Sequence, residues 1–323
     1  MKPTVIAVVG PTASGKTRLG AALAKALGGE VISFDSMQIY EGMDVATAKP
    51  TEEEMLGVPH HLIGFLPPDA AFSAAQFKAL CTAAVNDVLS RGKVPVLVGG
   101  TGLYFDTIYY NTTYFETADA SMRETLTARL QTQGAKALLS ELREIDPETA
   151  AALHPSDEKR ILRALEVYYA TGRTISEQKR LSRLQASPYA FCVIGLCAED
   201  RAFLYDRIDR RVDAMVEQGL LQEARHYYEN APAGTAKQAI GYKELQPYFD
   251  GQCTLDAALD RLRMETRRYA KRQLTWFRRN KAIRWLQIDR LSAGELLSES
   301  LEIIRQETGL TPPKEKTDEE IVP

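Results

Sequence analysis

Short apolar segments alternate with segments of helical periodicity over the first 115 residues of the chain. Residues 5–9, 30–34 and 94–98 are apolar runs whose length is typical of buried strands. Residues 18–27 and 73–90 repeat their apolar positions with a helical period. Because strands and helices alternate, we expect a parallel sheet with crossover helices, and the predicted fold class is α/β.

The same patterns predict elements in the rest of the chain, and Ser73 stands where it can cap the helix that follows it. The further predicted elements are a strand at 61–65, a helix from Leu103, a strand at 189–196, helices at 201–230 and 254–279, and a strand at 282–288.

The pattern changes character from about residue 117. Residues 120–172 are almost entirely helical in pattern, with breaks at two X-Pro pairs. A helical block inserted into an α/β sheet predicts a separate lobe. We therefore expect a discontinuous P-loop NTPase-like core at 1–116 and 187–309, an inserted all-helical lobe at 117–186, and a disordered, charged tail at 310–323.

The segment between the first strand and the first helix reads G-P-T-A-S-G-K-T and fits the phosphate-binding pattern G-x-x-x-x-G-K-[ST] at every fixed position. In this setting, backbone N–H groups wrap a phosphate at a helix N-terminus, where the helix dipole also favours anions. Lys16 is expected to reach the terminal phosphate, and the Thr17 hydroxyl to contact Mg²⁺. The predicted phosphate-binding residues are Gly10, Pro11, Thr12, Ala13, Ser14, Gly15, Lys16 and Thr17.

A carboxylate follows the second predicted strand. Asp35 lies 19 residues beyond Lys16, and ligands of open α/β sheets bind outside the carboxyl ends of the strands. Asp35 and the phosphate loop are therefore expected to share one crevice, where the carboxylate could accept a proton or hold Mg²⁺. Nearby Gln38 has a side-chain amide that could read a purine edge through two hydrogen bonds.

The loop after residues 94–98 reads G-G-T-G and carries no acid. An NTPase usually places a magnesium-binding Asp after another core strand, so the absence of an acid here argues against ATP hydrolysis as the function. The glycines instead offer backbone N–H groups and room for close approach. The pattern favours a bound diphosphate that is a leaving group.

Composition leaves a soluble globular enzyme as the expected class. The chain has 323 residues, a net charge of −3 and 45% hydrophobic residues, with no apolar run long enough for a membrane span. Because the first strand begins almost at once, we expect no signal peptide, and the four cysteines lack the spacing of a metal or disulfide site. We expect a cytoplasmic protein with reduced thiols.

One segment is strongly basic despite the acidic net charge. Ten Lys or Arg residues and one acid, Glu265, lie between Arg261 and Arg284. Such a helix is commonly a solvated face, but the interleaved aromatics Tyr269, Trp276 and Phe277 favour contact with nucleic acid. A small-molecule kinase and a non-catalytic RNA-binding protein are the alternatives to a transferase.

The chain resembles the tRNA dimethylallyltransferases in several blocks that occur in that family's order. These blocks are the phosphate loop, D-S-M-Q-I-Y-x-G-M-D-x-x-T-A-K-P from Asp35, G-G-T-G-L-Y, A-L-E-V, G-Y-K-E and K-R-Q-L-T-W-F-R. The resemblance covers about residues 10–280. It implies transfer of a dimethylallyl group from dimethylallyl diphosphate to N6 of the adenosine 3′-adjacent to the anticodon, in tRNAs reading codons that begin with U.

The resemblance also implies a role for individual residues. The phosphate loop would hold the donor diphosphate with Mg²⁺, Asp35 would be the base, Thr101 would line the channel, and Arg207 would contact the diphosphate. The target adenine must leave the anticodon loop to reach the donor. The implied tRNA contacts are Asp35, Ser36, Met37, Gln38, Thr101, Arg123, Lys159, Arg160, Ile161, Leu162, Arg163, Gln238, Gly241, Tyr242, Lys243, Lys271, Arg272, Gln273, Trp276 and Arg278.

The sequence departs from the commoner family pattern at Phe34, Glu41 and Ala46, none of which is an implied chemical group. Glu41 does put one local tRNA-facing charge in doubt. No Cys₂His₂ pattern follows the core, which suits a bacterial type of enzyme. By the same resemblance the protein is expected to be a monomer.

Overall fold

The structure of the chain is a computed structural model that describes residues 2–115, 120–230, 236 and 239–313. The chain forms two compact units, of which the larger comprises Met1–Phe105 and Pro188–Pro323 and the smaller Asp106–Ser187. The expected lobe boundary at 117 and most of the expected tail, residues 314–323, lie outside the described residues.

The division between the units falls inside one helix, α3, which spans Gly102–Tyr109. Its first turn belongs to the large unit, because the Phe105 ring contacts Phe34 and Phe277 with centroids 6.0 and 5.7 Å apart. Its second turn belongs to the small unit, where the buried Thr107 hydroxyl lies 2.6 Å from the Tyr114 hydroxyl. Because the apolar pattern of α3 continues across this boundary, the sequence gives no sign of the division between the units.

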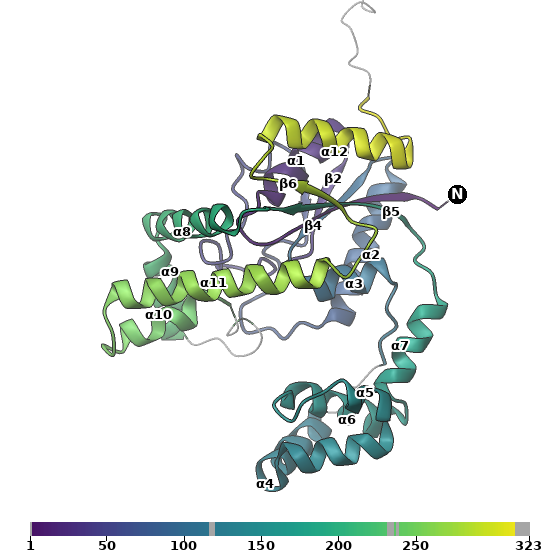
Figure 1. Cartoon of the computed structure of the whole chain (residues 1–323), viewed down its shortest axis with the longest axis vertical. Coiled ribbons are helices and arrows are strands. Elements are labelled where there is room, and N and C mark those ends of the chain that lie inside the picture. Colours follow the sequence, from purple (N-terminus) through teal and green to yellow (C-terminus); the bar gives the residue numbers. More distant parts are fainter. Residues whose placement is uncertain (1, 116–119, 231–235, 237–238, 314–323) are drawn as a thin grey trace, which may run out of the picture. The chain divides into compact units, whose positions relative to one another are not determined.

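The large unit is built on a six-stranded parallel sheet in the order β3-β2-β4-β1-β5-β6, as Figure 1 shows in part. Ile6 on the central strand pairs with Val96 on one side and Cys192 on the other. The strands are β1 (Thr4–Val9), β2 (Glu30–Ser33), β3 (His60–His61), β4 (Pro95–Gly99), β5 (Ala190–Cys197) and β6 (Arg284–Gln287). The predicted α/β class with a P-loop NTPase-like parallel sheet is confirmed.

Helices cover both faces of this sheet, with α1 and α12 on one face and α3 and α11 on the other (Figure 1). Apolar side chains of β1, β4 and β5 pack with those of α1 and α12 in one buried core. Besides α3, the helices of the large unit are α1 (Lys16–Ala26), α2 (Ala74–Ser90), α8 (Arg201–Glu217), α9 (Leu220–Asn230), α10 (Tyr242–Phe249), α11 (Leu255–Phe277) and α12 (Ala293–Thr308).

A second apolar core of the large unit joins helices α8 to α11 to the segment after β2. Its fully buried members include Tyr40, Leu220 and Leu245. Because these helices pack beyond the carboxyl ends of the strands, they supply a wall to the region where the phosphate loop lies.

The small unit contains only helices in its described part. Its core of Leu126, Leu138, Leu142, Ile161 and Leu165 joins helices α4 and α6. Gly134 has non-helical angles (φ 80°, ψ 160°), which divide α4 into two helical segments joined at a kink. The helices are α4 (Ala120–Ile145), α5 (Pro147–Ala151), α6 (Glu158–Thr171) and α7 (Ile175–Leu184).

Most predicted elements are present, and the differences have local causes. Ser73 caps α2 with a full capping box, as expected. The strand expected at 61–65 ends at His61, because Leu62 and Gly64 adopt positive φ and turn the chain. Gly219, also at positive φ, divides the helix expected at 201–230 into α8 and α9. Helix α7 lies within the lobe expected to be all-helical, whereas α10 and α12 were not predicted.

A buried carboxylate stabilises the end of the sheet away from the phosphate loop. Glu30, at the start of β2, accepts hydrogen bonds at 2.7 Å from each of Arg91, Lys93 and His61. Its side chain is 2% exposed. The hydrogen bonds from Arg91 in particular hold the pKa of Glu30 well below its usual range, against the opposing effect of burial.

We expect acid to destabilise the large unit through Glu30. Because its pKa is lower in the folded than in the unfolded chain, the stabilisation is complete well above the unfolded value of 4.5 and is lost as pH falls below it. Urea unfolding followed by the fluorescence of Trp276 and Trp285, both in the large unit, measures this. Glu30→Gln should cost about 1–3 kcal/mol at neutral pH. The free energy of unfolding of this variant should fall less steeply in acid than that of the wild type. Parallel curves of this free energy against pH for the two proteins would contradict the prediction.

Candidate active site

The predicted phosphate-binding residues form a loop between β1 and the N-terminus of α1. Gly15 caps the helix in the left-handed region (φ 90°), and Ala13 also has a positive φ of 61°. The Lys16 ammonium donates a hydrogen bond to the Pro11 carbonyl at 3.2 Å. This strand–loop–helix geometry presents backbone N–H groups at a helix N-terminus and so suits an anion.

Two side chains from distant helices hold the phosphate loop. Gln273 on α11 accepts a hydrogen bond from the Thr12 N–H at 2.8 Å and donates one to the Gly100 carbonyl at 2.9 Å. Arg207 on α8 donates from Nε to the Ala13 carbonyl at 2.7 Å. The phosphate loop is therefore bound to the G-G-T-G loop by the same helix that carries the basic segment.

The glycines of the G-G-T-G loop allow α11 to approach closely. A Cβ atom on Gly100 would lie 2.2 Å from Gln273 Nε2, and one on Gly102 would lie 2.2 Å from Trp276 Cδ1. Such distances are far below van der Waals contact. The close approach expected from the sequence is present, and in this structure its partner is α11.

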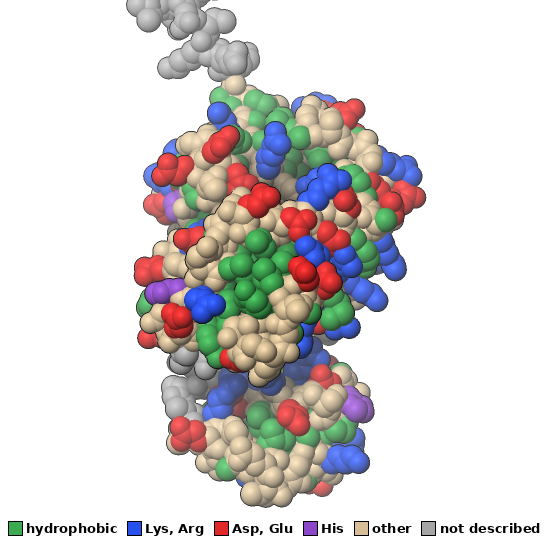
Figure 2. Space-filling model, turned by 90° about the vertical axis from the view of Figure 1, so that its left-hand side faces the viewer, with side chains coloured by type: hydrophobic (Ala, Val, Ile, Leu, Met, Phe, Trp, Pro, Cys, Tyr) green, Lys and Arg blue, Asp and Glu red, His purple; other side chains and the backbone are tan. Residues whose placement is uncertain are grey.

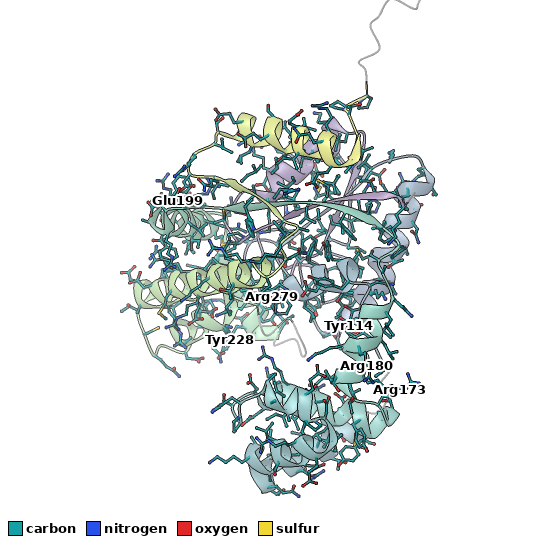
Figure 3. The ribbon with its side chains drawn as sticks, turned by 45° about the vertical axis from the view of Figure 1, so that its right-hand side comes forward. Tyr114, Arg173, Arg180, Glu199, Tyr228 and Arg279 are labelled. Atoms are coloured by element: carbon teal, nitrogen blue, oxygen red, sulfur yellow. The ribbon has the colours of Figure 1, made fainter. Side chains whose placement is uncertain are left out.

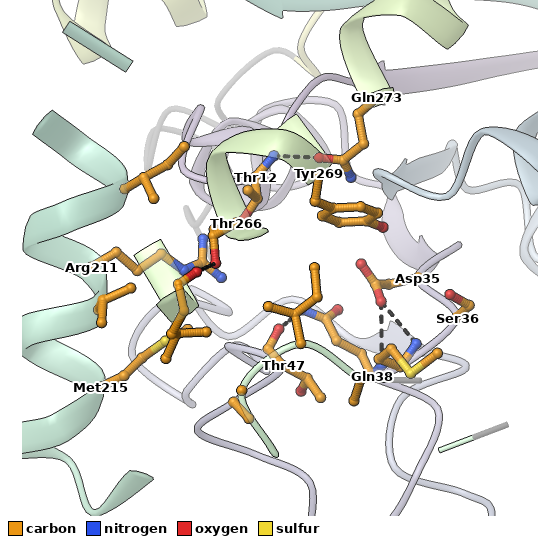
Figure 4. A pocket seen from close by; sticks show the side chains of 18 of the residues that line it. Thr12, Asp35, Ser36, Gln38, Thr47, Arg211, Met215, Thr266, Tyr269 and Gln273 are labelled. Atoms are coloured by element: carbon orange, nitrogen blue, oxygen red, sulfur yellow. Dashed lines mark hydrogen bonds between the residues drawn. The ribbon is translucent and has the colours of Figure 1, made fainter. Parts of the chain in front are cut away.

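Asp35 lies at the carboxyl end of β2, and a local turn orients its side chain. Its Oδ1 atom accepts hydrogen bonds from the Met37 and Gln38 amides at 2.9 and 3.4 Å. The Thr101 hydroxyl accepts from the Ser36 amide at 3.0 Å, so the G-G-T-G loop also supports this turn. The carboxylate thus has one oxygen bound to backbone, while the residue lines the cavity described next (Figure 4).

A cavity of about 340 Å³ in the large unit brings these parts together. Figure 4 shows Asp35 and Gln38 on one side, Arg211 and Met215 of α8 on another, and Thr266, Tyr269 and Gln273 of α11 above them. The residues lining it are Thr12, Lys16, Thr17, Asp35, Ser36, Met37, Gln38, Ala46, Thr47, Ile208, Arg211, Val212, Met215, Leu220, Ala239, Ile240, Gly241, Lys243, Leu262, Thr266, Tyr269, Arg272 and Gln273.

Charged and apolar groups are separated within the cavity. Burial, and after it the charge of Arg211, lower the pKa of Lys16 to about 8, against the opposing effect of Asp35. Burial also lowers the pKa of Arg211, although a guanidinium stays charged. Burial and then Asp35 raise the pKa of Tyr269, so its hydroxyl remains a donor. Val212, Met215 and other apolar side chains line the rest.

We expect the affinity for inorganic pyrophosphate to depend on Lys16 protonation. The anion favours protonated Lys16, so affinity is highest below its pKa of about 8 and falls as pH rises through that value. Between about pH 7 and about pH 9 the loss should be about tenfold. Titration calorimetry measures it, with Lys16→Arg as control because arginine does not deprotonate in this range. The protonation of pyrophosphate itself affects both proteins equally. Equal slopes of affinity against pH for the wild type and Lys16→Arg would contradict the assignment of the pH dependence to Lys16.

Some functional candidates were missed from the sequence. Arg211 follows Arg207 by four residues, so both lie on one face of α8, and this spacing could have revealed it. Arg211 lines the cavity, whereas Arg207 is not among its lining residues and donates a hydrogen bond to the Ala13 carbonyl of the phosphate loop. No local signal distinguishes Thr266 or Tyr269, because only the packing of α11 brings them to the cavity.

Several expected tRNA contacts occupy other positions in the large unit. Thr101 bonds to Ser36 and is absent from the cavity lining among the described residues. Tyr242 is buried, with its hydroxyl bonded to Glu223 at 2.8 Å. Gly241 and Lys243 line the cavity. Gln238 lies outside the described residues.

The basic segment on α11 divides into a paired and an exposed part. Arg263 and Arg267 form ion pairs with Asp213 and Asp209 on α8. Figure 2, which views the large unit from the side of α8 to α10, shows acidic and basic side chains intermixed there. Near its end the helix carries the exposed Lys271 and Arg272, and the exposed Arg278 and Arg279 follow it directly. The Arg279 guanidinium, labelled in Figure 3, lies 4.0 Å from the Trp276 ring centroid.

In the small unit two of the expected tRNA contacts pair with one buried carboxylate. Glu166 forms ion pairs with Arg163 at 3.1 Å and Arg123 at 3.5 Å. Its side chain is 8% exposed, so it joins α4 to α6 while both guanidinium groups reach the surface. Of the other expected contacts, Lys159 and Arg160 are exposed, Leu162 is half-buried, and Ile161 is fully buried in the core.

Two further findings limit the kind of site. Within the described part of the chain, no three His, Cys, Asp or Glu side chains are grouped so that they could hold a metal ion by themselves. The helices formed by these residues include none with the length and apolar character needed to cross a membrane.

The parallel sheet, with a loop of the P-loop pattern after β1 and a cavity beside it, defines an α/β protein of the P-loop NTPase-like class. Residues 38–280 match the family model described as IPP transferase, and the chain belongs to this family of tRNA dimethylallyltransferases.

Individual relatives are similar over nearly the whole chain. A tRNA dimethylallyltransferase of Halalkalibacterium halodurans is 49% identical over 290 residues, which cover 89% of this chain and 92% of that protein. The crystal structure of a full-length tRNA isopentenylpyrophosphate transferase from Bacillus halodurans matches with a TM-score of 0.70 at 43% identity, covering 96% of this chain and 99% of that one. A eukaryotic dimethylallyltransferase acting on tRNA matches with a TM-score of 0.83 at 28% identity, covering 97% and 81%.

Proposed function

We propose that this chain transfers a dimethylallyl group from dimethylallyl diphosphate to N6 of the adenosine 3′-adjacent to the anticodon, in tRNAs reading codons beginning with U. As a member of its family the chain is a tRNA dimethylallyltransferase, a prenyltransferase enzyme. The observation that carries the residue assignment is the single cavity that joins the phosphate loop, Asp35 and an apolar wall.

The diphosphate of the donor binds at the phosphate loop. The N–H groups at the start of α1, the Lys16 ammonium and the Arg211 guanidinium offset the negative charge that grows as the diphosphate leaves. Arg207 supports this loop through the Ala13 carbonyl. The buried Ser14 hydroxyl has no hydrogen-bond partner among the described residues, and a phosphate oxygen would supply one.

The residues present fit a Mg²⁺ ion that arrives with the diphosphate. Mg²⁺ commonly takes one or two protein oxygens and completes its shell with water and substrate phosphates. Thr17 and Asp35 both line the cavity and offer a hydroxyl and a carboxylate. When bound, the ion would neutralise charge on the leaving diphosphate, with Thr17 as its ligand and Asp35 within the same cavity.

The acceptor adenine enters the same cavity from the side of Asp35 and Gln38. Its N6 atom attacks the first carbon of the dimethylallyl group, the carbon–oxygen bond breaks, and the electron pair leaves with the diphosphate. Asp35 accepts the proton that N6 loses. An exocyclic amine is a weak nucleophile, so rigid positioning supplies much of the acceleration. Apolar residues such as Met215 keep water from the reacting carbon.

The tRNA contacts divide between the two units. In the large unit, Lys271, Arg272, Trp276 and Arg278 offer positive charge and a stacking surface to the RNA backbone and bases. In the small unit, Arg123, Lys159, Arg160 and Arg163 offer cations to phosphates. We further propose that the protein works as a monomer, because both substrates meet in a cavity lined by one chain.

Incubation of the protein with tRNA and labelled dimethylallyl diphosphate, without ATP, tests this function. We expect label in the tRNA at one adenosine and release of diphosphate. A small-molecule kinase would require ATP and would leave the tRNA unlabelled. Phosphate transfer from ATP to a metabolite, with unlabelled tRNA, would overturn the proposal.

A further inference from the structure

A single carboxylate binds three consecutive backbone amides, the last of which belongs to a residue that lines the cavity. Glu223 on α9 accepts hydrogen bonds from Asp44, Val45 and Ala46 N–H at 2.8, 2.7 and 2.9 Å. The Tyr242 hydroxyl donates to the same carboxylate at 2.8 Å. Tyr242 is 5% exposed, and its ring stacks on Tyr227 with centroids 4.1 Å apart. The carboxylate is thus held between a rigid aromatic pair and the backbone.

The turn that Glu223 binds also contacts Gln38 at its other end. The Gln38 side-chain Nε2 donates to the Thr47 and Ala48 carbonyls at 3.3 and 2.9 Å. The Ala48 N–H donates to the Val45 carbonyl at 3.0 Å, which closes the turn. Amides at the start of the turn therefore donate to the Glu223 carboxylate, and carbonyls at its end accept from the Gln38 side chain. The backbone dipoles of the turn favour both contacts.

Packing as well as hydrogen bonding fixes this turn. Ala46 and Thr47 line the cavity. A Cβ atom on Gly241 would lie 3.0 Å from the Ala46 Cβ, so the glycine before Tyr242 leaves just enough room for the turn. The G-Y-K-E segment thus supports the turn through its glycine and its tyrosine, which are separate groups with separate contacts.

We infer that Glu223 is a positioning residue, which acts through the 44–48 turn to hold the Gln38 amide in one orientation at the acceptor side of the cavity. This inference rests on the proposed function and extends it. Among the described contacts, both Gln38 N–H groups are used by the turn, and the Oε1 atom accepts from Ser33 at 3.3 Å. An amide oxygen has a second acceptor site. That site can accept a hydrogen bond from the N6 amino group of adenine. The carbonyl at the same position of inosine has no hydrogen to donate and would repel the amide oxygen.

Glu223→Gln tests the inference, because its amide keeps an acceptor oxygen but loses the negative charge. We expect kcat/KM for tRNA to fall about tenfold or more, which is the range for a charged hydrogen-bond acceptor. The KM for dimethylallyl diphosphate should stay within about twofold, since the phosphate loop is untouched. Tyr242→Phe removes one of the four contacts and should give a smaller loss in the same direction. Glu229→Gln, an exposed glutamate on the same helix, is the matched control.

A double-mutant cycle separates positioning from general support. If Glu223 acts through Gln38, the variant Glu223→Gln with Gln38→Ala should be no slower than Gln38→Ala alone. We also compare the affinities for two anticodon stem-loops, one with adenosine and one with inosine at the target position. The ratio of these two affinities should be smaller for Glu223→Gln than for the wild type. Additive effects, unchanged discrimination, or an equal loss of affinity for the donor would overturn the inference. Failure of the wild type to prenylate tRNA would instead overturn the proposed function.

Discussion

We expect Asp35→Asn to lower kcat by about 10²–10⁴-fold, the range for loss of a general base. The asparagine side-chain oxygen can still accept from the Met37 and Gln38 amides, so the turn at the end of β2 keeps its shape. What is lost is the negative charge that takes the N6 proton. Single-turnover prenylation of tRNA, with enzyme in excess, measures the chemical step without product release.

The matched control is Asp69→Asn, because Asp69 is an exposed carboxylate of the same unit. Binding of tRNA to Asp35→Asn, measured separately by filter binding, should be nearly unchanged. A loss of tRNA affinity as large as the loss of rate would mean that Asp35 acts in recognition. A rate within about twofold of the wild type would exclude Asp35 as the base.

Neutralising the exposed end of α11 is the second large effect we expect. Lys271→Gln combined with Arg278→Gln removes two charges that form no ion pair with the described residues, unlike Arg263 and Arg267. Affinity for tRNA should fall about 10–100-fold at low salt, and the slope of log K against log salt should become shallower by about one to two. Binding isotherms at several salt concentrations measure both quantities.

A control with the same change of net charge separates contact from long-range attraction. Lys25→Gln with Arg305→Gln alters α1 and α12, which cover the opposite face of the sheet (Figure 1). This pair should leave the salt slope unchanged. An unchanged slope for the α11 pair would place that end of the helix in solvent, away from the RNA.

The phosphate loop illustrates what a local pattern can predict. Its residues are contiguous, and both its strand and its helix follow from apolar periodicity, so the sequence predicts its conformation. The supports of the loop are different. Gln273 and Arg207 reach it from 261 and 194 residues away, and no periodic pattern relates such positions.

Residue type alone predicts exposure less well than it predicts chemistry. Tyr242 and Ile161 stand in segments expected to contact tRNA, yet both are buried, because neighbouring helices cover them. Their direct role in tRNA binding stays a prediction, and their packing offers an indirect one. The basic segment behaves similarly, since the sequence shows ten cations but only α8 decides that Arg263 and Arg267 are paired with acids.

By itself the sequence determined the α/β class, the phosphate loop, the carboxylate at the end of the second strand and the family. Each of these depends on contiguous residues or on regular spacing, which local sterics and apolar periodicity govern. Only the tertiary structure decided that Arg211 enters the cavity, that Gln273 joins two loops, and that Glu223 holds the turn beside Gln38. These contacts join residues far apart in the chain, and they form because two apolar cores bring α8, α9 and α11 over the ends of the strands.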